Sequence, residues 1–255
     1  MMPRLDPAFL GAPLAHRALH DVSDGRPENS RAAIRAAVSH GYGIEIDLQL
    51  SADNHAVVFH DYTLDRLAVA AGPVRALTAT ALAQTRLRGG DEGVPDLPEV
   101  LELVAGRVPV LIEIKDQDGA MGPDIGLLEA ATATALEGYA GPVAVMSYNP
   151  HSVARMGVLC PDIPRGLVTS AHDSDDPPLP AHISDRLREI PDFDRVGASF
   201  ISHDAADLSR PRVAELKAAG ANILCWTVRS PEAEAEARKV AENITFEGYL
   251  AAHPG

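Results

Sequence analysis

The stretch GIEIDLQL, residues 43–50, decides the fold. Successive side chains of a β-strand point to opposite faces, so the apolar residues at 44, 46 and 48 share one face and the polar residues at 45, 47 and 49 share the other. The stretch VLIEIK, residues 110–115, repeats this phase and places Glu113 and Lys115 on its polar face. A parallel strand covered on both faces is normally apolar throughout. The polar residues therefore predict that this face of the sheet leads to an opening and is not covered along its whole length.

Short apolar runs alternate with longer amphipathic stretches along the rest of the chain. The pattern predicts strands at 12–16, 43–49, 55–60, 108–115, 142–147, 164–168, 196–202, 222–228 and 247–250. It predicts helices from Asn29 or Ser30 to Gly41 and at 98–105, 124–137, 149–157, 211–219 and 231–241. This alternation indicates a parallel sheet with helical crossovers, either an open doubly wound sheet or a closed (β/α)8 barrel.

We favour the barrel, because its inner face ends at an open mouth where the carboxyl ends of the strands meet. Residues 1–255 are expected to form a single TIM-barrel domain. Residues 61–97 do not fit a compact strand–helix step and are interpreted as an excursion with a helix near 78–84. Residues 172–180, rich in proline and polar side chains, are expected to form a second loop.

Composition excludes several classes of protein. The chain has 255 residues with 36 acidic and 22 basic side chains, a formal charge of -14, and no basic run that would bind nucleic acid. Its N-terminal stretch, MMPRLDPAFLGAPLAH, lacks the apolar core of a secretory signal, and no stretch approaches a transmembrane helix. We therefore expect a cytoplasmic protein without a membrane anchor. Cys160 and Cys225 lie far apart in sequence and predict no disulfide framework.

Three carboxylates share the inward phase of the two polar strands. Glu45 and Asp47 have Cα atoms roughly 6.8 Å apart, and Glu113 comes from the second strand. At ~5 Å, each pair of carboxylates would repel by about 3 kcal/mol at an effective dielectric near 20. A divalent cation would offset this repulsion, and oxygen ligands favour Mg²⁺, Ca²⁺ or Mn²⁺. The alternative is that the acids pair with Lys115 and an arginine.

Two histidines close predicted strands. His16 ends the first strand and His60 ends the run 56–59. A single histidine is more often structural, but two strand-end histidines beside a carboxylate cluster would supply one acid and one base. Arg17 could grip an anion such as phosphate, or pair with Glu28 or Asp47. The pair His203-Asp204 is interpreted as part of a loop.

Six short motifs in order resemble the glycerophosphodiester phosphodiesterase family. They span residues 12 to 228, and each is weak alone. The motifs are His16-Arg17, Pro27-Glu28-Asn29-Ser30, Glu45-Ile46-Asp47, His60-Asp61 followed by Asp65-Arg66, Glu113-Ile114-Lys115, and Trp226-Thr227-Val228.

The resemblance implies a TIM barrel that uses a divalent metal, Mg²⁺ or Ca²⁺ or else Mn²⁺, to hydrolyse glycerophosphodiesters to glycerol 3-phosphate and an alcohol. It implies that His16 and His60 are the acid/base pair, acting through a cyclic phosphate. By the same resemblance, the metal ligands are Glu45, Asp47 and Glu113. The substrate-binding residues are Arg17 and Lys115 at the phosphate and Trp226 beside the glycerol.

The chain departs from the family pattern at three places. Ala18 stands where the family usually has glycine, Arg229 where it often has asparagine, and Ala251-Ala252-His253-Pro254 where a Thr-Asp-x-Pro motif is expected after the last strand. These departures bear on the pocket for the alcohol.

Two other functions are open. A related barrel enzyme, lysophospholipase D-like or phosphoinositide phospholipase-like, would use the same chemistry on lipid diesters but would need an apolar rim, and aromatic residues are only 4%. A binding protein without turnover would lack one of the histidines or carboxylates, and none is missing. The enzyme with a small glycerophosphodiester substrate is therefore the leading interpretation.

Overall fold

A computed structural model describes residues 3–173 and 179–253. The strands are β1 (Leu14–Ala15), β2 (Gly43–Leu50), β3 (Ala56–Val58), β4 (Val110–Ile114), β5 (Val143–Ser147), β6 (Arg165–Thr169), β7 (Phe200–Asp204), β8 (Asn222–Val228) and β9 (Asn243–Phe246). The helices are α1 (Arg31–His40), α2 (Ala79–Gln84), α3 (Leu97–Val104), α4 (Leu127–Leu136), α5 (Pro150–Leu159), α6 (Ala181–Arg188), α7 (Pro211–Ala218) and α8 (Pro231–Ala237).

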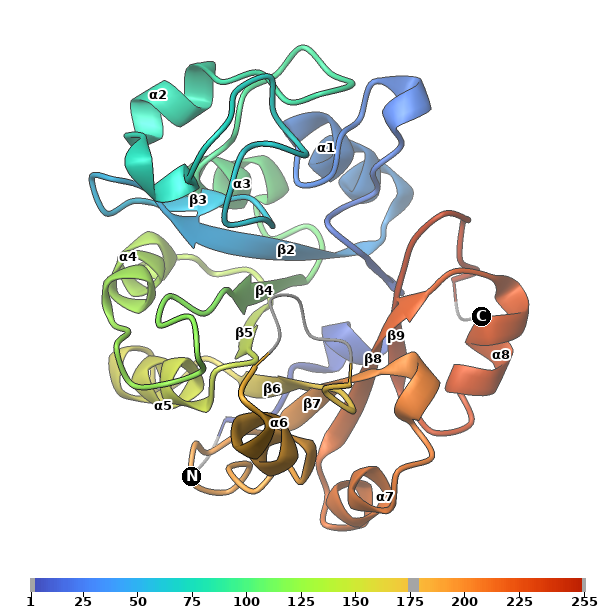
Figure 1. Cartoon of the computed structure of the whole chain (residues 1–255). Helices are drawn as coiled ribbons and strands as arrows, with labels where there is room; N and C mark the ends of the chain where they lie inside the picture. The colour runs from blue at the N-terminus through green and yellow to red at the C-terminus, as the bar shows by residue number, and fades with distance from the viewer. Residues whose placement is uncertain (1–2, 174–178, 254–255) are drawn as a thin grey trace.

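Eight parallel strands close into a barrel, as the polar strand faces predicted. β1 pairs with both β2 and β9, and the sheet continues from β9 through β8, β7, β6, β5 and β4 back to β2. The helices surround this barrel (Figure 1). The fold is a TIM barrel, whose functional residues gather at the carboxyl ends of the strands.

The remaining strand, β3, is not part of the barrel. It pairs antiparallel with the end of β2, so the predicted strand 55–60 forms a hairpin and not a barrel step. The excursion of residues 61–97 follows it and contains α2, lying above β2 and β3 in Figure 1. It has its own apolar cluster, which includes the buried Phe59, Leu64 and Leu82.

Helix α1 shows how the sequence specifies its local structure. The Ser30 side chain caps the amino end by accepting a hydrogen bond from the backbone of Ala33, and Gly41 ends the helix with a left-handed φ of 72°. Its buried face, which includes Ile34, packs on the outside of the barrel. Of the two predicted caps, Ser30 is the one used.

The barrel interior is apolar toward the amino ends of the strands. Leu111, Met146, Phe200 and Leu224 form a cluster inside the strands, and the N-terminal segment inserts Phe9 into it. Phe9 is 0% exposed. The side chain of Asn243 donates hydrogen bonds of 2.7 and 2.9 Å to the carbonyls of Phe9 and Ala12. The N-terminal segment thus closes the end of the barrel opposite the carboxyl ends of the strands.

The C-terminal third differs from the prediction at several points. The last strand is β9, residues 243–246, and not 247–250. Its sequence, NITF, is short and contains two polar residues, so its apolar pattern is weak. The strand predicted at 196–202 lies at 200–204, and α6 was not predicted. Residues 174–178 of the predicted second loop lie outside the described residues. Cys225 is buried in β8, and both cysteines are free.

In the described ranges, no helix has the length and apolar character that crossing a bilayer requires.

Candidate active site

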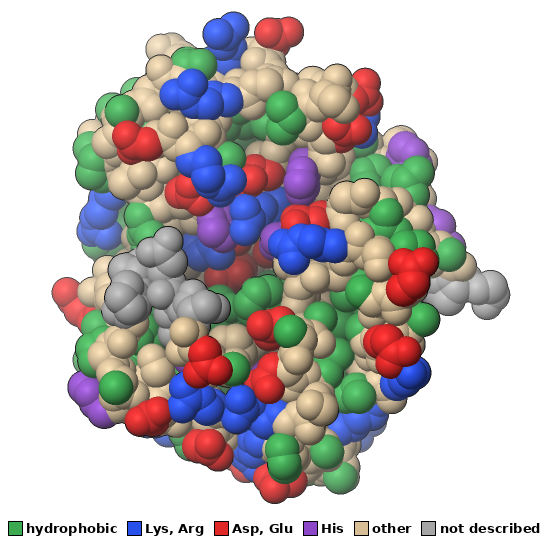
Figure 2. Space-filling view, turned by 45° about the vertical axis from the view of Figure 1, so that its right-hand side comes forward, with side chains coloured by type: hydrophobic (Ala, Val, Ile, Leu, Met, Phe, Trp, Pro, Cys, Tyr) green, Lys and Arg blue, Asp and Glu red, His purple; other side chains and the backbone are tan. Residues whose placement is uncertain are grey.

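A cavity of about 180 Å³ opens at the carboxyl ends of the barrel strands. Figure 2 shows the hollow, with histidine and basic side chains gathered around acidic ones. Its walls include all eight residues singled out from the sequence: His16, Arg17, Glu45, Asp47, His60, Glu113, Lys115 and Trp226. Six further residues complete the lining: Met146, Tyr148, Val168, Thr227, Arg229 and Thr245.

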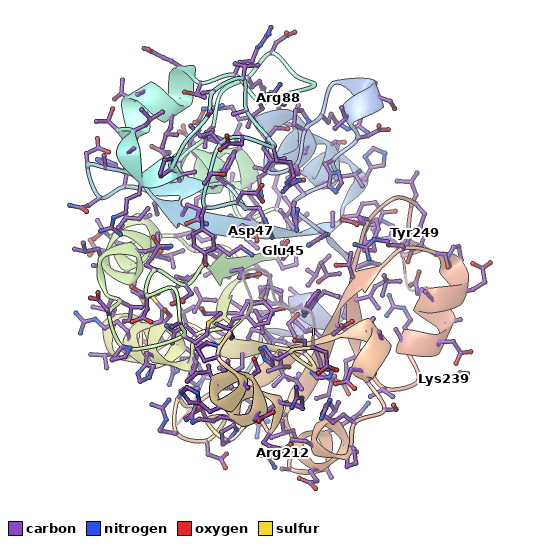
Figure 3. The ribbon with its side chains drawn as sticks, in the orientation of Figure 1. Glu45, Asp47, Arg88, Arg212, Lys239 and Tyr249 are labelled. Atoms are coloured by element: carbon purple, nitrogen blue, oxygen red, sulfur yellow. The ribbon has the colours of Figure 1, made fainter. Side chains whose placement is uncertain are left out.

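The three carboxylates meet on one side of this cavity. Asp47 of β2 and Glu113 of β4 are partners in the strand register, and Glu45 lies one inward position below Asp47. Each residue offers an oxygen within 4.8 Å of the others, and all three residues are buried. Figure 3 labels Glu45 and Asp47 near the centre of the barrel. The register of two parallel strands therefore builds the cluster.

Two basic side chains reach the cluster. Lys115 Nζ lies 2.7 Å from both Asp47 Oδ1 and Glu113 Oε1, and Arg17 Nε lies 3.7 Å from Asp47 Oδ2. Pairing of the acids with Lys115 and an arginine, the alternative weighed above, is therefore present in the structure. Lys115 is not a solvated lysine at a strand end, because its side chain is only 12% exposed.

These cations do not balance the three acids. Burial alone would raise the pKa of Asp47, but Lys115, His60 and Arg17 outweigh it and hold that pKa well below its usual range. Glu45 has the opposite shift. Burial, then the charges of Asp47 and Glu113, raise the pKa of Glu45 well above its ordinary value. Simultaneous ionisation of all three carboxylates is therefore opposed where they meet.

The donor set fits a hard divalent cation. All three candidate ligands are carboxylate oxygens, which suit Mg²⁺, Ca²⁺ or Mn²⁺. Asn29 is buried beside them and donates a 2.9 Å hydrogen bond from Nδ2 to Asp47 Oδ2, which fixes the rotation of that carboxylate. Burial is the main cause of the raised pKa of Glu45, and a cation would offset the repulsion from Asp47 and Glu113 that adds to it.

His16 is held by a carboxylate that the sequence analysis did not identify. Its Nδ1 lies 2.6 Å from Glu247 Oε2, and Glu247 also pairs with Arg229 Nε at 2.8 Å and faces His20 Nε2 at 3.5 Å. Burial lowers the pKa of His16, and Glu247 opposes that shift. The hydrogen bond from His16 and the nearby His20 lower the pKa of Glu247, which keeps this carboxylate ionised.

His60 has a similar arrangement on another wall of the cavity. Its Nδ1 lies 2.7 Å from Asp61 Oδ1, and Arg66 donates from Nε to Asp61 Oδ2 at 2.8 Å. Burial would raise the pKa of Asp61, but hydrogen bonds from His60 and Arg66 lower it. Within the described part of the chain, Nε2 of neither His16 nor His60 forms a hydrogen bond, so both can face a ligand.

Arg17 lies in a turn that requires unusual backbone angles. Arg17 and Ala18 both have left-handed conformations, with φ of 51° and 64°. Ala18 therefore adopts a conformation that glycine enters at lower cost. The backbone N–H of Arg17 donates to Glu45 Oε2 at 2.9 Å, and its Nη1 donates to Glu28 Oε1 at 2.8 Å.

Aromatic side chains form the wall opposite the carboxylates. Trp226 donates from Nε1 to the carbonyl of Ser202 at 2.9 Å, which fixes its ring. Tyr148 meets it edge to face with ring centroids 6.0 Å apart. The cavity therefore has a charged side and an aromatic side, an arrangement suited to a small amphiphilic ligand.

Glu247 was missed because the last strand was placed four residues too late. Residues 251–253 of the C-terminal departure lie away from the mouth, because Tyr42 donates to the carbonyl of Ala251 and His253 stacks on Tyr42. Pro254 lies outside the described residues. The sequence signal available for Glu247 was its place as a charged residue directly after the short run of residues 243–246. His203 was also misread, because it lies within β7, 0% exposed, and bonds to Thr169 Oγ1 at 2.8 Å.

Comparisons with known proteins agree with this geometry. The model of the glycerophosphoryl diester phosphodiesterase family matches residues 16–245. A Bacillus subtilis (strain 168) protein, YhdW, named as a candidate glycerophosphodiester phosphodiesterase, is 27% identical over 234 residues, which is 88% of each chain. A glycerophosphodiester phosphodiesterase of Caldanaerobacter subterraneus subsp. tengcongensis is 32% identical over 61% of this chain and 65% of its own.

The fold is similar to that of solved structures. A phosphodiesterase from Oleispira antarctica, in complex with its product sn-glycerol 3-phosphate, superposes with a TM-score of 0.76 at 23% identity, covering 94% of each chain.

Proposed function

The chain belongs to the glycerophosphoryl diester phosphodiesterase family, and from this premise we propose that the cavity hydrolyses glycerophosphodiesters to glycerol 3-phosphate and an alcohol. The observation that carries the proposal is the arrangement of His16 and His60. Each donates through Nδ1 to its own carboxylate, and both line one small cavity with three further carboxylates. Such a pair suits proton transfer on both sides of a phosphorus centre.

We propose that Glu45, Asp47 and Glu113 hold one divalent cation, which would offset charge on the phosphate as the reaction proceeds. Lys115 and Arg17 lie beside these ligands and would contact the remaining phosphate oxygens. The cavity of about 180 Å³ is smaller than the ~300–1,000 Å³ typical of drug-sized ligands. It therefore suits a glycerophosphate group, with the alcohol portion extending toward the mouth.

The two histidines would act in sequence. One Nε2 takes the proton from the glycerol hydroxyl beside the phosphate, and that oxygen forms a new bond to phosphorus. The bond from phosphorus to the alcohol breaks, and the other histidine gives its proton to the departing oxygen. The resulting cyclic phosphate is opened by water with the two roles reversed, which returns both histidines to their starting states.

The aromatic wall supports the orientation of the substrate. Trp226 lies beside Tyr148 and across the cavity from Glu113 and Lys115, so the carbon face of glycerol would pack on Trp226 while the phosphate meets the charged side. This would place the reacting hydroxyl within the cavity rather than at its mouth.

The test is hydrolysis by the purified protein with Mg²⁺, Mn²⁺ or Ca²⁺. The substrates are glycerophosphocholine, other glycerophosphodiesters and, for the lipid alternative, lysophospholipids and phosphoinositides. We expect release of glycerol 3-phosphate, loss of turnover in His16→Ala and His60→Ala, and loss on thorough chelation. His182→Ala, an exposed histidine on α6, is the matched control. Near-wild-type turnover in both histidine variants would refute the scheme, and inertness toward every substrate would refute the activity.

A further inference from the structure

Arg66 occupies an unusual position for an exposed side chain. It comes from the excursion and donates two hydrogen bonds to each of two carboxylates. It reaches Asp61 from Nε and Nη2 at 2.8 and 2.7 Å, and Glu28 from Nη1 and Nη2 at 2.9 and 3.0 Å. Four of the five N–H groups of one guanidinium are thus engaged, which fixes both acids in the plane of the fork.

Each carboxylate also accepts a hydrogen bond from a different residue of the cavity lining and so restricts the orientation of that residue. Asp61 holds His60 through Nδ1 at 2.7 Å. Glu28 holds Arg17 through Nη1 at 2.8 Å. Arg66 therefore connects a group proposed to transfer a proton with a group proposed to bind phosphate, although it is not part of the cavity lining.

The backbone around Arg66 is rigid enough for this purpose. Leu64 and Ala68, on either side, are buried in the apolar cluster of the excursion, and the Ala68 N–H donates to the Leu64 carbonyl at 2.8 Å. The Arg66 side chain is 50% exposed, and ion pairs at such positions contribute little to folding unless they are bidentate and joined in a network, as they are here. The positioning role is therefore tested below by readouts that a contribution to folding alone would not change.

We infer that Arg66 is a positioning residue that orients His60 through Asp61 and Arg17 through Glu28. The inference rests on the roles proposed above for His60 and Arg17. It gives the excursion of residues 61–97 a function, because the excursion anchors one guanidinium that joins two loops at the mouth. It also predicts that the two contacts of Arg66 affect different kinetic constants. The contact through Asp61 should affect kcat, and the contact through Glu28 should affect KM.

Steady-state kinetics on glycerophosphocholine would separate the effects of the contacts through Asp61 and through Glu28. Groups that hydrogen-bond to a site residue from outside the site typically contribute about 10- to 100-fold, so we expect Asp61→Asn to lower kcat and Glu28→Gln to raise KM by amounts of that order. Arg66→Ala should do both, and Arg66→Lys should restore only a small part because lysine cannot form the fork. In the double variant Arg66→Ala/Glu28→Gln, KM should rise no further than in Arg66→Ala alone.

Controls separate positioning from folding. Arg88→Ala removes another exposed arginine of the excursion, whose side chain forms no ion pair or hydrogen bond among the described residues, and should change neither constant (Figure 3). Added guanidinium should partly restore Arg66→Ala but not Asp61→Asn. The inference fails if Arg66→Ala keeps both constants within about twofold while His60→Ala is inactive, or if KM effects of Arg66→Ala and Glu28→Gln multiply.

A readout without turnover makes the inference independent of the proposed activity. ¹⁵N NMR of the imidazoles reports which nitrogen of His60 carries the proton. We expect the Nδ1–H form in the wild type and a mixture of both forms in Arg66→Ala, with the Arg88→Ala spectrum unchanged. An identical His60 spectrum in Arg66→Ala overturns the positioning role even if no diester is cleaved, whereas an inert wild type with the expected spectra overturns only the proposed function.

Discussion

Replacing Glu247 tests the most important contact that the sequence analysis missed. A charge-assisted hydrogen bond, such as the 2.6 Å contact with His16 Nδ1, is worth about 1.5–3 kcal/mol. At 1.36 kcal/mol per factor of ten, Glu247→Ala should lower kcat by about 10- to 150-fold. Gln keeps an acceptor but removes the charge, and neutral bonds are roughly half as strong, so Glu247→Gln should cost about 3- to 13-fold.

The pH profile gives a second measure of the same contact. Burial lowers the pKa of His16 and Glu247 opposes this, so removing the charge of Glu247 should lower that pKa further. The limb of the kcat/KM profile that His16 controls should therefore move to lower pH. If this is the acidic limb, His16 is the base of the first step, and if it is the basic limb, His16 is the acid.

The assay is turnover of glycerophosphocholine between pH 5 and 9, with thermal unfolding measured in parallel. Glu236→Gln is the control, because Glu236 is an exposed acid of α8 that pairs with Lys239 on the same surface. Turnover of Glu247→Ala within about twofold of the wild type, with neither limb displaced, would refute the reasoning.

Four further predictions concern other parts of the molecule. Glu113→Gln should weaken binding of Mg²⁺ or Mn²⁺ at least about tenfold in titration calorimetry, because it removes one of three oxygen ligands. Trp226→Ala should raise KM for glycerophosphocholine more than it lowers kcat, as measured in steady-state assays, because it removes the aromatic wall and leaves the histidines in place. Phe9→Ala should lower the free energy of unfolding by about 3–5 kcal/mol in urea titrations, because Phe9 is fully buried at the closed end of the barrel. The pKa of Asp61 is lower in the folded protein than in the unfolded chain, so its contribution to stability is present above its ordinary pKa near 4 and is lost as pH falls further. The difference in Tm between wild type and Asp61→Asn should accordingly shrink between about pH 5 and pH 3.

The barrel could be predicted because its polar signal is local. The alternation in residues 43–50 and 110–115 fixes which side chains point inward, and the register then places Asp47 beside Glu113. Seven of the eight site residues lie within a barrel strand or within two residues of its end, and His60 follows β3, so the strand pattern brings them to one cavity. The roles assigned to these residues stay predictions, as does the single-domain boundary.

The remaining features depend on contacts between distant segments. Glu247 meets His16 across 231 residues of sequence, and no local pattern reports such a pair. Asp61 and Arg66 were noted as parts of a motif, but their connection to Glu28 requires the fold of the excursion. His203 was assigned to a loop because a histidine next to an aspartate is usually solvated, yet Thr169 and Asp207 satisfy its ring in the buried strand β7.

The pairing of β1 with β9 joins two segments that are made far apart in time during synthesis. His16 leaves the ribosome early, but its partner Glu247 follows 231 residues later, which at ~5–20 residues per second takes about 10–50 s. Until then β1 lacks one neighbour, and the Phe9 segment lacks the side chain of Asn243 that holds it. A nascent chain therefore carries both histidines proposed as the acid/base pair, and the proposed metal ligands, well before the carboxylate that holds His16.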